Sequence, residues 1–231
     1  RNLYLGIESQ LSSLDIANST SQLAPIWNEW FVVDSVFTGN TAYGFLVNLF
    51  RSALMGNYAI ATQGEHAMRI QHTQKIFISN NDLYGSPTGT ALTIRGWAWE
   101  LINRTSGNQY TLPAYSYSEE SVVSDNKIVS HSSALPYTYA SPNATEHPRL
   151  RNHISERNWV ISGTIGRPLA TISGEMTVRN NVFQDSGNVG LPTISAETTE
   201  DPVFNNQYFY NNSSYSEVVS SLYGFSVIGT S

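Results

Sequence analysis

The stretch WVISGTIGRPLATISGEMTVRNN, residues 159–181, carries the strongest fold signal in this chain. Apolar and polar residues alternate through its second half, so that one side would hold Ala170, Ile172, Gly174, Met176 and Val178. Because successive side chains of a strand point to opposite faces, this pattern predicts a strand with one buried and one wet face. Glycine and proline within 163–168 predict a turn before it. We therefore interpret the stretch as two strands joined by a short turn.

Further strands are predicted on both sides of this unit. Trp27–Phe37 is aromatic and β-branched enough for a first core strand, and similar runs follow at 43–50, 53–62, 68–78, 92–98 and 218–228. Two long loops are expected, at 104–144 with a short hairpin over Val122–Val129, and at 185–206. No repeat of fixed period is visible. Many short strands at this spacing indicate an all-β sandwich or barrel.

The composition excludes several classes of function. Only 13% of the 231 residues are charged, the net charge is −6, and the chain holds 13 Tyr and 5 Trp. Nucleic-acid binding requires a basic footprint, so no nucleic-acid partner is expected. A neutral surface rich in hydroxyl, amide and aromatic groups is typical of binding through many weak contacts, or of an extracellular or virion surface with little charge. No run of apolar residues approaches the length of a membrane span, so no membrane insertion is expected.

Reactive motifs are not evident. The chain has no cysteine, which excludes disulfides, thiolate nucleophiles and Cys-based zinc sites, and fits assembly in a reducing compartment. The five histidines, at 66, 72, 131, 147 and 153, lack metal-ligand spacing, so no metal or cofactor is predicted. Paired acids at Glu119–Glu120 and at Glu197, Glu200 and Asp201 are interpreted as solvated loop residues. A hydrolase with two facing carboxylates is a third reading, and the prediction is that the chain is not an enzyme. Glycosylation sequons occur at Asn18, Asn103, Asn143, Asn211 and Asn212.

The order of these features resembles the head of the adenovirus fibre. Ile26–Trp27 follows a thin alternating segment, as the head follows the shaft in that family. The run LVNLFRSALMGNYAIATQG, residues 46–64, is similar to the paired second and third strands of those heads. Tyr139–Asn143 (YASPN), the pair at 159–181 and the closing Tyr223–Ile228 strand are similar to later pieces. At the start of the head this chain has Pro25–Ile26–Trp27–Asn28 in place of the family's Leu-Trp-Thr, which indicates a divergent branch of the family.

This resemblance implies an antiparallel β-sandwich of about eight strands with long loops, assembled as a homotrimer. Residues 1–25 would be the end of the shaft or a linker, and 26–231 the receptor-binding head. The implied function is attachment of a virion to a host cell-surface receptor, either a protein or a sialylated glycan, from the distal end of a fibre assembled in the host nucleus. Heads of this family commonly bind protein receptors through the loop between the first two strands. The candidate contacts here are Asp34, Ser35, Thr38, Gly39, Asn40 and Thr41.

A glycan-binding lectin, or a phage or bacterial adhesin with a sandwich or jelly-roll fold, is the alternative. Its binding platforms would be loop aromatics, with Tyr115, Tyr117, Tyr137 and Tyr139 as the candidates. Each of these rings, taken singly, is better explained by packing on the sandwich.

Overall fold

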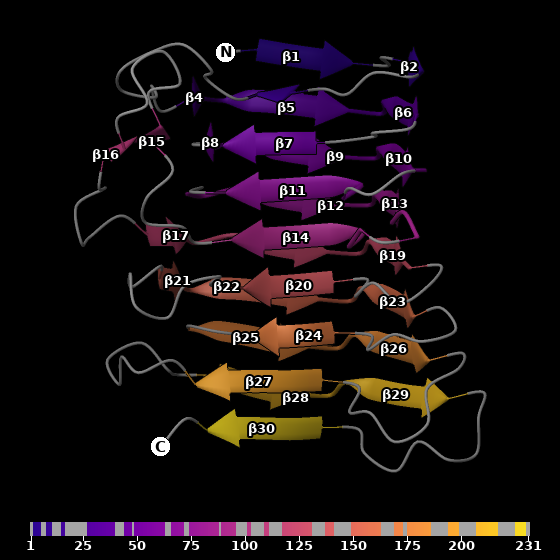
Figure 1. Cartoon of the computed structure of the whole chain (residues 1–231), viewed down its shortest axis with the longest axis vertical. Coiled ribbons are helices and arrows are strands. Elements are labelled where there is room, and N and C mark those ends of the chain that lie inside the picture. The colour runs from indigo at the N-terminus through magenta and orange to yellow at the C-terminus, as the bar shows by residue number, and fades with distance from the viewer. Residues whose placement is uncertain are drawn as a thin grey trace.

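The structure is a computed structural model, and it describes the following parts of the chain. The described residues are 2–5, 8–10, 15–16, 27–39, 44–47, 49–62, 66–71, 74–87, 89–95, 101–102, 109–110, 117–130, 137–140, 149–162, 169–172, 175–185, 194–198, 207–216 and 225–229. Figure 1 shows them as a stack of coils, with the N-terminus at one end of the long axis and the C-terminus near the other.

Three sheets of eight strands each form the walls of this stack. Sheet A contains β1 (Asn2–Leu5), β5 (Trp30–Val33), β9 (Ala53–Met55), β12 (Phe77–Ser79), β18 (Val122–Ser124), β22 (His153–Glu156), β25 (Met176–Arg179) and β28 (Gln207–Tyr210). Sheet B contains β2 (Glu8–Gln10), β6 (Val36–Gly39), β10 (Tyr58–Ala61), β13 (Asp82–Tyr84), β19 (Lys127–Val129), β23 (Trp159–Ser162), β26 (Val182–Asp185) and β29 (Ser213–Ser216). Sheet C contains β3 (Asp15–Ile16), β7 (Gly44–Val47), β11 (Met68–Gln71), β14 (Leu92–Arg95), β20 (Tyr137–Ala140), β24 (Leu169–Ile172), β27 (Ile194–Thr198) and β30 (Phe225–Gly229).

Three two-stranded pairings lie outside these sheets. They are β4 (Trp27–Asn28) with β8 (Leu49–Phe50), β17 (Tyr117–Glu119) with β21 (Arg149–Arg151), and β15 (Leu101–Ile102) with β16 (Gln109–Tyr110). None of the described segments forms a helix long and apolar enough to cross a membrane.

The chain visits the three sheets in turn, so each coil adds one strand to each sheet and the fold is a parallel β-helix (Figure 1). Every pairing within the large sheets is parallel, as in β5 with β9, where Val32 lies opposite Leu54. The predicted antiparallel β-sandwich is therefore wrong, although the all-β prediction is confirmed. The physical reason for the error is that a strand's alternation is the same whether its neighbours run parallel or antiparallel.

The stretch 159–181 is not a pair of adjacent strands. It contributes β23 to sheet B, β24 to sheet C and β25 to sheet A, which is nearly one complete coil. The predicted turn at 163–168 lies outside the described residues. The predicted inward face is confirmed for Met176 and Val178, which are buried. The hairpin predicted over Val122–Val129 is also wrong, because β18 and β19 belong to different sheets.

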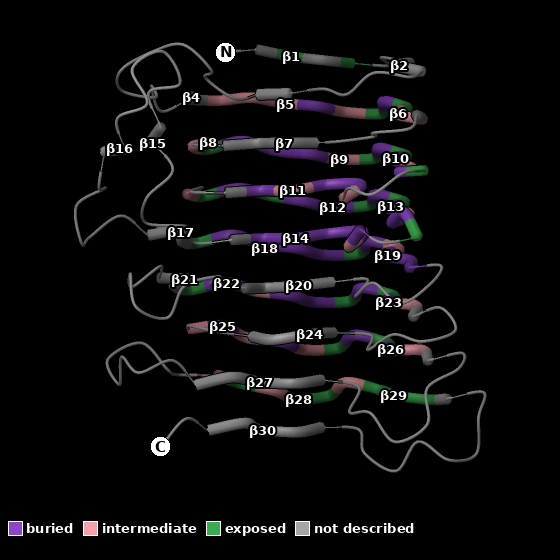
Figure 2. The backbone as a smooth tube through the Cα atoms, in the orientation of Figure 1, coloured by how far each residue is buried: buried purple, intermediate pink, exposed green. Residues whose placement is uncertain are grey.

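The core lies inside the coil and is built from the inward apolar residues of the central strands. Sheet A supplies Val32, Leu54, Ile78, Val123 and Val178, and the opposite wall in sheet C supplies Met68, Ile70, Leu92 and Ile94. Sheet B closes the interior with Ala59, Leu83, Ile128, Val160 and Phe183. Figure 2 shows these buried positions stacking from coil to coil. Burial of aliphatic side chains in this column is the main apolar stabilisation of the fold.

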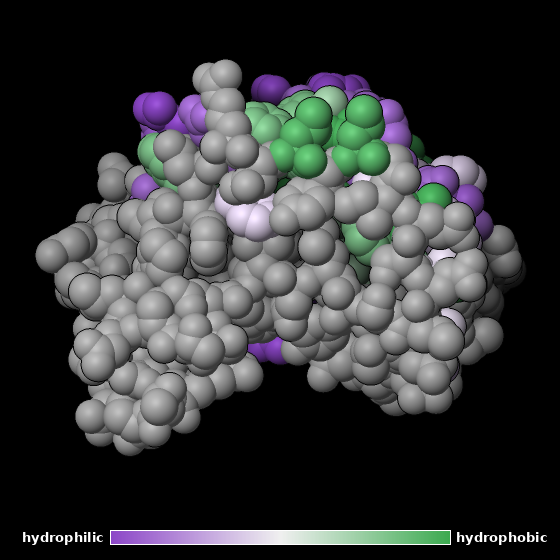
Figure 3. Space-filling model, turned by 90° about the horizontal axis from the view of Figure 1, so that it is seen from above, coloured by the Kyte–Doolittle hydropathy of each residue, from purple (hydrophilic) through white to green (hydrophobic). Residues whose placement is uncertain are grey.

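The first strands of the three sheets belong to residues 1–25. β1 pairs with β5 in register, with Leu3 opposite Phe31 and Leu5 opposite Val33. Leu3 and Leu5 are 67% and 62% exposed on the outer side of sheet A. Hydrophobic side chains also gather on one side of the molecule when it is seen from this end (Figure 3). The division into a shaft segment and a head stays a prediction.

The corner between sheets A and B repeats almost unchanged through seven coils. In each, one residue adopts a left-handed backbone: Asp34, Gly56, Asn80, Asp125, Arg157, Asn180 and Asn211, with φ between 48° and 67°. The residue that follows is Ser35 in the first of these corners and asparagine in the other six: Asn57, Asn81, Asn126, Asn158, Asn181 and Asn212. A left-handed backbone costs free energy for residues other than glycine. The hydrogen bonds made by the residue that follows offset this cost and stabilise the corner.

These six asparagines form a ladder of hydrogen bonds parallel to the coil axis. The backbone N–H of Asn126 donates to Oδ1 of Asn158 (3.0 Å), and the backbone N–H of Asn158 donates to Oδ1 of Asn181 (2.9 Å). The Nδ2 group of Asn126 also donates to the carbonyl of Ile78 on the preceding coil (3.0 Å). Side chains of Asn57, Asn81, Asn126, Asn158 and Asn181 are buried, so each donor and acceptor must be satisfied within the ladder.

Gly56 is the one glycine in the left-handed column. A Cβ atom built there would collide with the Asp34 carboxylate of the coil before it. Glycine at this position therefore provides space for Asp34 as well as an unstrained backbone.

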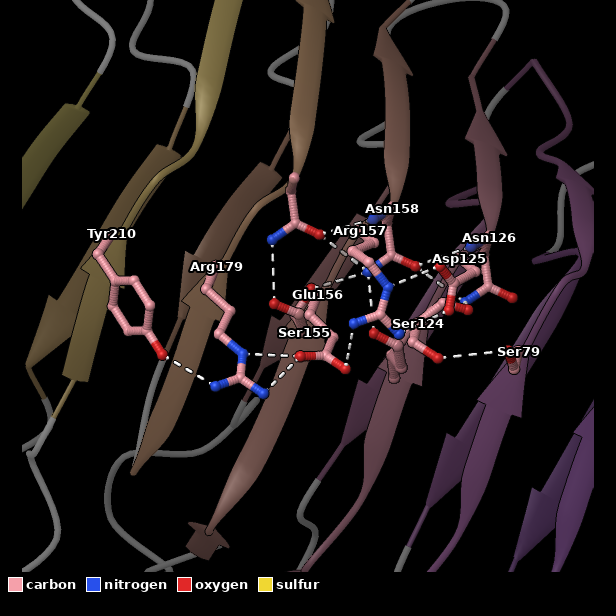
Figure 4. A network of polar contacts seen from close by, with 12 residues as sticks. Ser79, Ser124, Asp125, Asn126, Ser155, Glu156, Arg157, Asn158, Arg179 and Tyr210 are labelled. Carbon is pink, nitrogen blue, oxygen red and sulfur yellow. Dashed lines mark hydrogen bonds and ion pairs between the residues drawn. The ribbon is translucent and has the colours of Figure 1, made fainter.

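A second polar network covers the corner on its sheet A side (Figure 4). Arg157 binds Asp125 through two hydrogen bonds (2.8 and 2.9 Å) and reaches Glu156 with Nη1 (2.7 Å). Arg179 contacts the other oxygen of Glu156 (2.7 Å from Nε) and donates to the Tyr210 hydroxyl (3.0 Å). The network thus joins four successive coils by charge-assisted bonds.

These contacts lower the pKa of both carboxyl groups. For Asp125 the hydrogen bonds from Arg157 are the main cause, and they lower its pKa below 3.8. Burial raises the pKa of Glu156, but the hydrogen bonds from Arg179 and Arg157 outweigh burial, so its pKa lies below 4.5. Both groups therefore stay ionised in the folded protein to lower pH than in the unfolded chain.

We predict that Asn126→Ala destabilises the protein by about 2–4 kcal/mol, because it leaves the backbone N–H and Nδ2 of Asn81 without their acceptor. Urea unfolding followed by circular dichroism measures the loss. The matched control is Asn180→Gly, at an exposed left-handed position, which should be close to neutral. Equal unfolding free energies for the two variants would contradict the ladder's role.

We also predict that the free energy of unfolding falls in acid. The folded pKa values of Asp125 and Glu156 are lowered, so their contribution is complete above about pH 4.5 and is lost as pH falls through the folded values. Glu156→Gln should reduce this slope in urea unfolding series between about pH 6 and about pH 3. Glu120→Gln is the control, since its pair with Lys75 is exposed and contributes little. An unchanged slope in Glu156→Gln would exclude the network as its source.

Candidate functional site

The outer face of sheet B carries two columns of side chains set by strand register. The first column runs through Val36, Tyr58, Asp82, Lys127, Trp159, Val182 and Ser213. The second runs through Thr38, Ile60, Tyr84, Val129, Ile161, Gln184 and Tyr215. Neighbouring strands lie about 4.8 Å apart, so residues in one column are close enough for their side chains to touch.

Six of these side chains, one from each of six successive strands, form a continuous series of contacts that we call the aromatic stripe. Its members, from β10 to β29, are Tyr58, Tyr84, Lys127, Trp159, Gln184 and Tyr215. The rings of Tyr58 and Tyr84 pack with centroids 5.5 Å apart. Trp159 donates from Nε1 to the Gln184 side-chain oxygen (3.2 Å), and the Tyr215 hydroxyl donates to the same oxygen (2.6 Å).

Lys127 links the two ends of the stripe. Its ammonium lies 5.6 Å from the centre of the Tyr84 ring and 5.5 Å from that of Trp159, within the range of cation–π attraction. A hydrogen bond with Tyr84 is the main cause that raises the pKa of Lys127 above 10.5, and the nearby charge of Asp82 also raises it. The ammonium is therefore charged at neutral pH.

The corner asparagines position the stripe. The residues one and three positions after each asparagine belong to these two columns, as Tyr58 and Ile60 follow Asn57. The residue between them points inward, as Ala59 does. Because the ladder fixes where each sheet B strand begins, the outward residues of successive coils stay in line.

The stripe is open to solvent and long. Tyr58, Trp159 and Tyr215 are 37%, 43% and 47% exposed. Six strands at the usual spacing span about 24 Å. An exposed row of rings and hydrogen-bonding groups, held by mutual contacts on a rigid sheet, is suited to bind an extended ligand without much loss of side-chain freedom.

The six residues predicted as receptor contacts fall near the first described corner. Asp34 has the left-handed backbone there, and Ser35 is buried, with its backbone N–H bound to Oδ1 of Asn57 (3.1 Å). Thr38 and Gly39 lie in β6, so this part of the predicted loop is a strand. Asn40 and Thr41 lie outside the described residues. Receptor contact by these residues stays a prediction. The four that the structure describes, Asp34, Ser35, Thr38 and Gly39, are not members of the aromatic stripe.

The other sequence candidates are dispersed. Tyr137 and Tyr139 lie in β20 of sheet C, Tyr117 lies in β17, and Tyr115 is outside the described residues. Within the described ranges, no group of three His, Asp or Glu side chains could hold a metal ion. Of the two adjacent sequons, Asn212 is held in the ladder through Oδ1 and Nδ2, whereas Asn211 is exposed.

Sequence reasoning missed the stripe because its residues lie 25 or more positions apart in the chain and only coil register brings them together. The signal available was the recurrence of asparagine, an outward residue and a buried residue, as in Asn57–Tyr58–Ala59 and Asn158–Trp159–Val160.

No family model matches this chain, and no curated protein matches it in sequence. A solved structure that matches is the crystal structure of the periplasmic alginate epimerase AlgG, with a TM-score of 0.46 and 15% identity. The match covers 88% of this chain, and the chain spans about half of that one (51%).

This match bears on one earlier prediction. The prediction that the chain is not an enzyme is withdrawn, since the matched structure is named as an epimerase. The similarity is too low to assign a reaction, a substrate or a site to this chain. It does not test the resemblance to the fibre head. Attachment to a host receptor, the homotrimer and the position on a virion stay predictions.

We predict that the outer face of sheet B tolerates substitution. Trp159→Ala should change the free energy of unfolding by about 1 kcal/mol, because the side chain is largely exposed and loses one hydrogen bond and one cation–π contact. Val160→Ala, at the fully buried next position, should cost about 2 kcal/mol. Thermal and urea unfolding of the two variants test this. A larger loss in Trp159→Ala would mean that the stripe serves mainly to stabilise the fold.

Proposed function

We propose that the chain binds a glycan, an extended sugar polymer that lies along the aromatic stripe parallel to the coil axis. The observation that carries this proposal is the uninterrupted contact series from Tyr58 to Tyr215 across six strands. A ligand that repeats along its length matches a surface that repeats along its length.

The chemistry of the stripe fits sugar rings. The faces of a pyranose present C–H groups with partial positive charge, and the faces of Tyr and Trp rings carry the negative lobes of their quadrupoles. Gln184 and Asp82 place an amide and a carboxylate beside these rings, where they can bind sugar hydroxyls. Flat rings for the sugar faces and polar groups for the sugar edges are thus present on one surface.

Rigidity supports the same proposal. Each member of the stripe contacts the next, so the side chains are already held in place before a ligand arrives. Tyr and Trp also have few rotatable bonds, which lowers the entropy lost on binding. Glycan binding of this kind is compatible with the predicted role in attachment and does not depend on it.

A glycan array of linear neutral and acidic polysaccharides, followed by calorimetry with oligomers of the best binder, tests the proposal. Trp159→Ala should weaken binding by about tenfold or more, since a central aromatic side chain commonly dominates such an interface. Tyr208→Ala is the matched control, because Tyr208 is 57% exposed on sheet A, away from the stripe.

Binding that is lost in Trp159→Ala and kept in Tyr208→Ala supports the proposal. No binding to any polysaccharide of the array, or equal affinities for both variants and the parent chain, would reject it.

A further inference from the structure

We infer that the glycan bound by the aromatic stripe is acidic, with a carboxylate or sulfate group that meets Lys127. This inference rests on the proposed glycan binding and names the class of sugar that the site selects.

The order of side chains along the stripe alternates over most of its length. From Tyr84 onward, rings occupy every second strand, at Tyr84, Trp159 and Tyr215. The strands between them present Lys127 and Gln184. The surface therefore repeats every two strands, with a ring at one position and a polar group at the next.

The repeat length of an extended glycan is similar to the spacing of the strands on this surface. One strand spacing is about 4.8 Å, which is close to the length that one pyranose adds to an extended chain. Successive sugars would therefore meet a ring, a polar group and a ring in turn. The sugar between Tyr84 and Trp159 lies against Lys127.

Lys127 differs in its pairing from Lys75, Arg157 and Arg179. Lys75, Arg157 and Arg179 each have a carboxylate oxygen within 3.0 Å. Among the residues that the structure describes, none places a carboxylate within the 4.0 Å of an ion pair to the Lys127 ammonium. Its contacts are the Tyr84 and Trp159 rings and the Tyr84 hydroxyl.

Covering this ammonium with a ligand has an energetic consequence. A neutral sugar stacked across Tyr84 and Trp159 would remove water from Lys127 without supplying an opposite charge, which disfavours binding. An anionic group on that sugar would replace the lost water with a charge-assisted hydrogen bond. The two rings also hold the ammonium in place, so little side-chain freedom is lost.

Asp82 is the counter-charge nearest in the same column, directly opposite Lys127 in the strand pairing. It attracts the ammonium from the side and repels an arriving anion. The inference therefore predicts opposite effects for the two residues, which a general loss of binding surface would not produce.

The test measures affinities for uronic acid oligomers of about six sugars, one per strand of the stripe. Oligomers of galacturonate, mannuronate and glucuronate are each compared with their methyl-esterified forms, which keep the sugar and lose the charge. Sulfated oligomers, compared with their unsulfated forms, separate a sulfate from a carboxylate as the group that is bound.

For the acidic form that binds best, Lys127→Met should reduce the affinity about tenfold, to the level of the uncharged form. Asp82→Asn should raise the affinity for the same oligomer severalfold. The preference for the acidic form should weaken as NaCl is added, and Lys127→Met should lose this dependence on salt. Lys75→Met is the matched control and should bind as the parent chain does, because Lys75 lies outside sheet B and pairs with Glu120.

Each failure has a distinct meaning. If acidic and uncharged forms bind equally, or if Lys127→Met keeps the preference, the inference is overturned, while sensitivity to Trp159→Ala would leave glycan binding intact. If no oligomer, acidic or uncharged, binds the parent chain, the inference is overturned, and a negative polysaccharide array would reject the proposed function as well.

Discussion

The whole arrangement depends on the buried asparagine ladder at the corner between sheets A and B. Each asparagine accepts from the backbone N–H of the coil before it, so an asparagine displaced along the axis would leave polar groups unpaired in the interior. This requirement holds every coil in the same register. It also offsets the cost of the left-handed residue that precedes each asparagine. The strands of the three sheets are aligned because this corner is fixed.

The ladder connects a local sequence choice to a long surface. When Asn126 and Asn158 are held at equivalent positions of their coils, Lys127 and Trp159 become neighbours although 32 residues separate them. The inward residues Ile128 and Val160 are aligned by the same register and pack in the core. One constraint therefore produces both the apolar column inside and the row of rings outside. A polar network of Asp125, Glu156, Arg157 and Arg179 supports the corner from its solvent side.

Much of the local strand structure could be predicted from the sequence, but the way in which the strands pair and coil could not. Alternation correctly predicted that Met176 and Val178 face the interior. It could not tell parallel from antiparallel pairing, since the period of a strand is the same in both. The antiparallel sandwich was predicted because short segments of the sequence occur in the same order as in the fibre head. Asp34 to Thr41 were predicted to be a loop for the same reason. Coil lengths that vary hid the repeat. The stripe exists only after coiling, and its one trace in the sequence was an asparagine followed by an outward residue and a buried residue.

The spacing of the ladder shows how this architecture tolerates variation in chain length. Asn158 and Asn181 are 23 residues apart, whereas Asn81 and Asn126 are 45 apart, and the bonds that join the two pairs are equally short at 2.9 Å. A coil can therefore gain about twenty residues without any adjustment by the coils above and below it. The longer of these two coils also contains the β15–β16 pair. Such a chain can acquire new loops one coil at a time, while the surface beside the ladder keeps its shape.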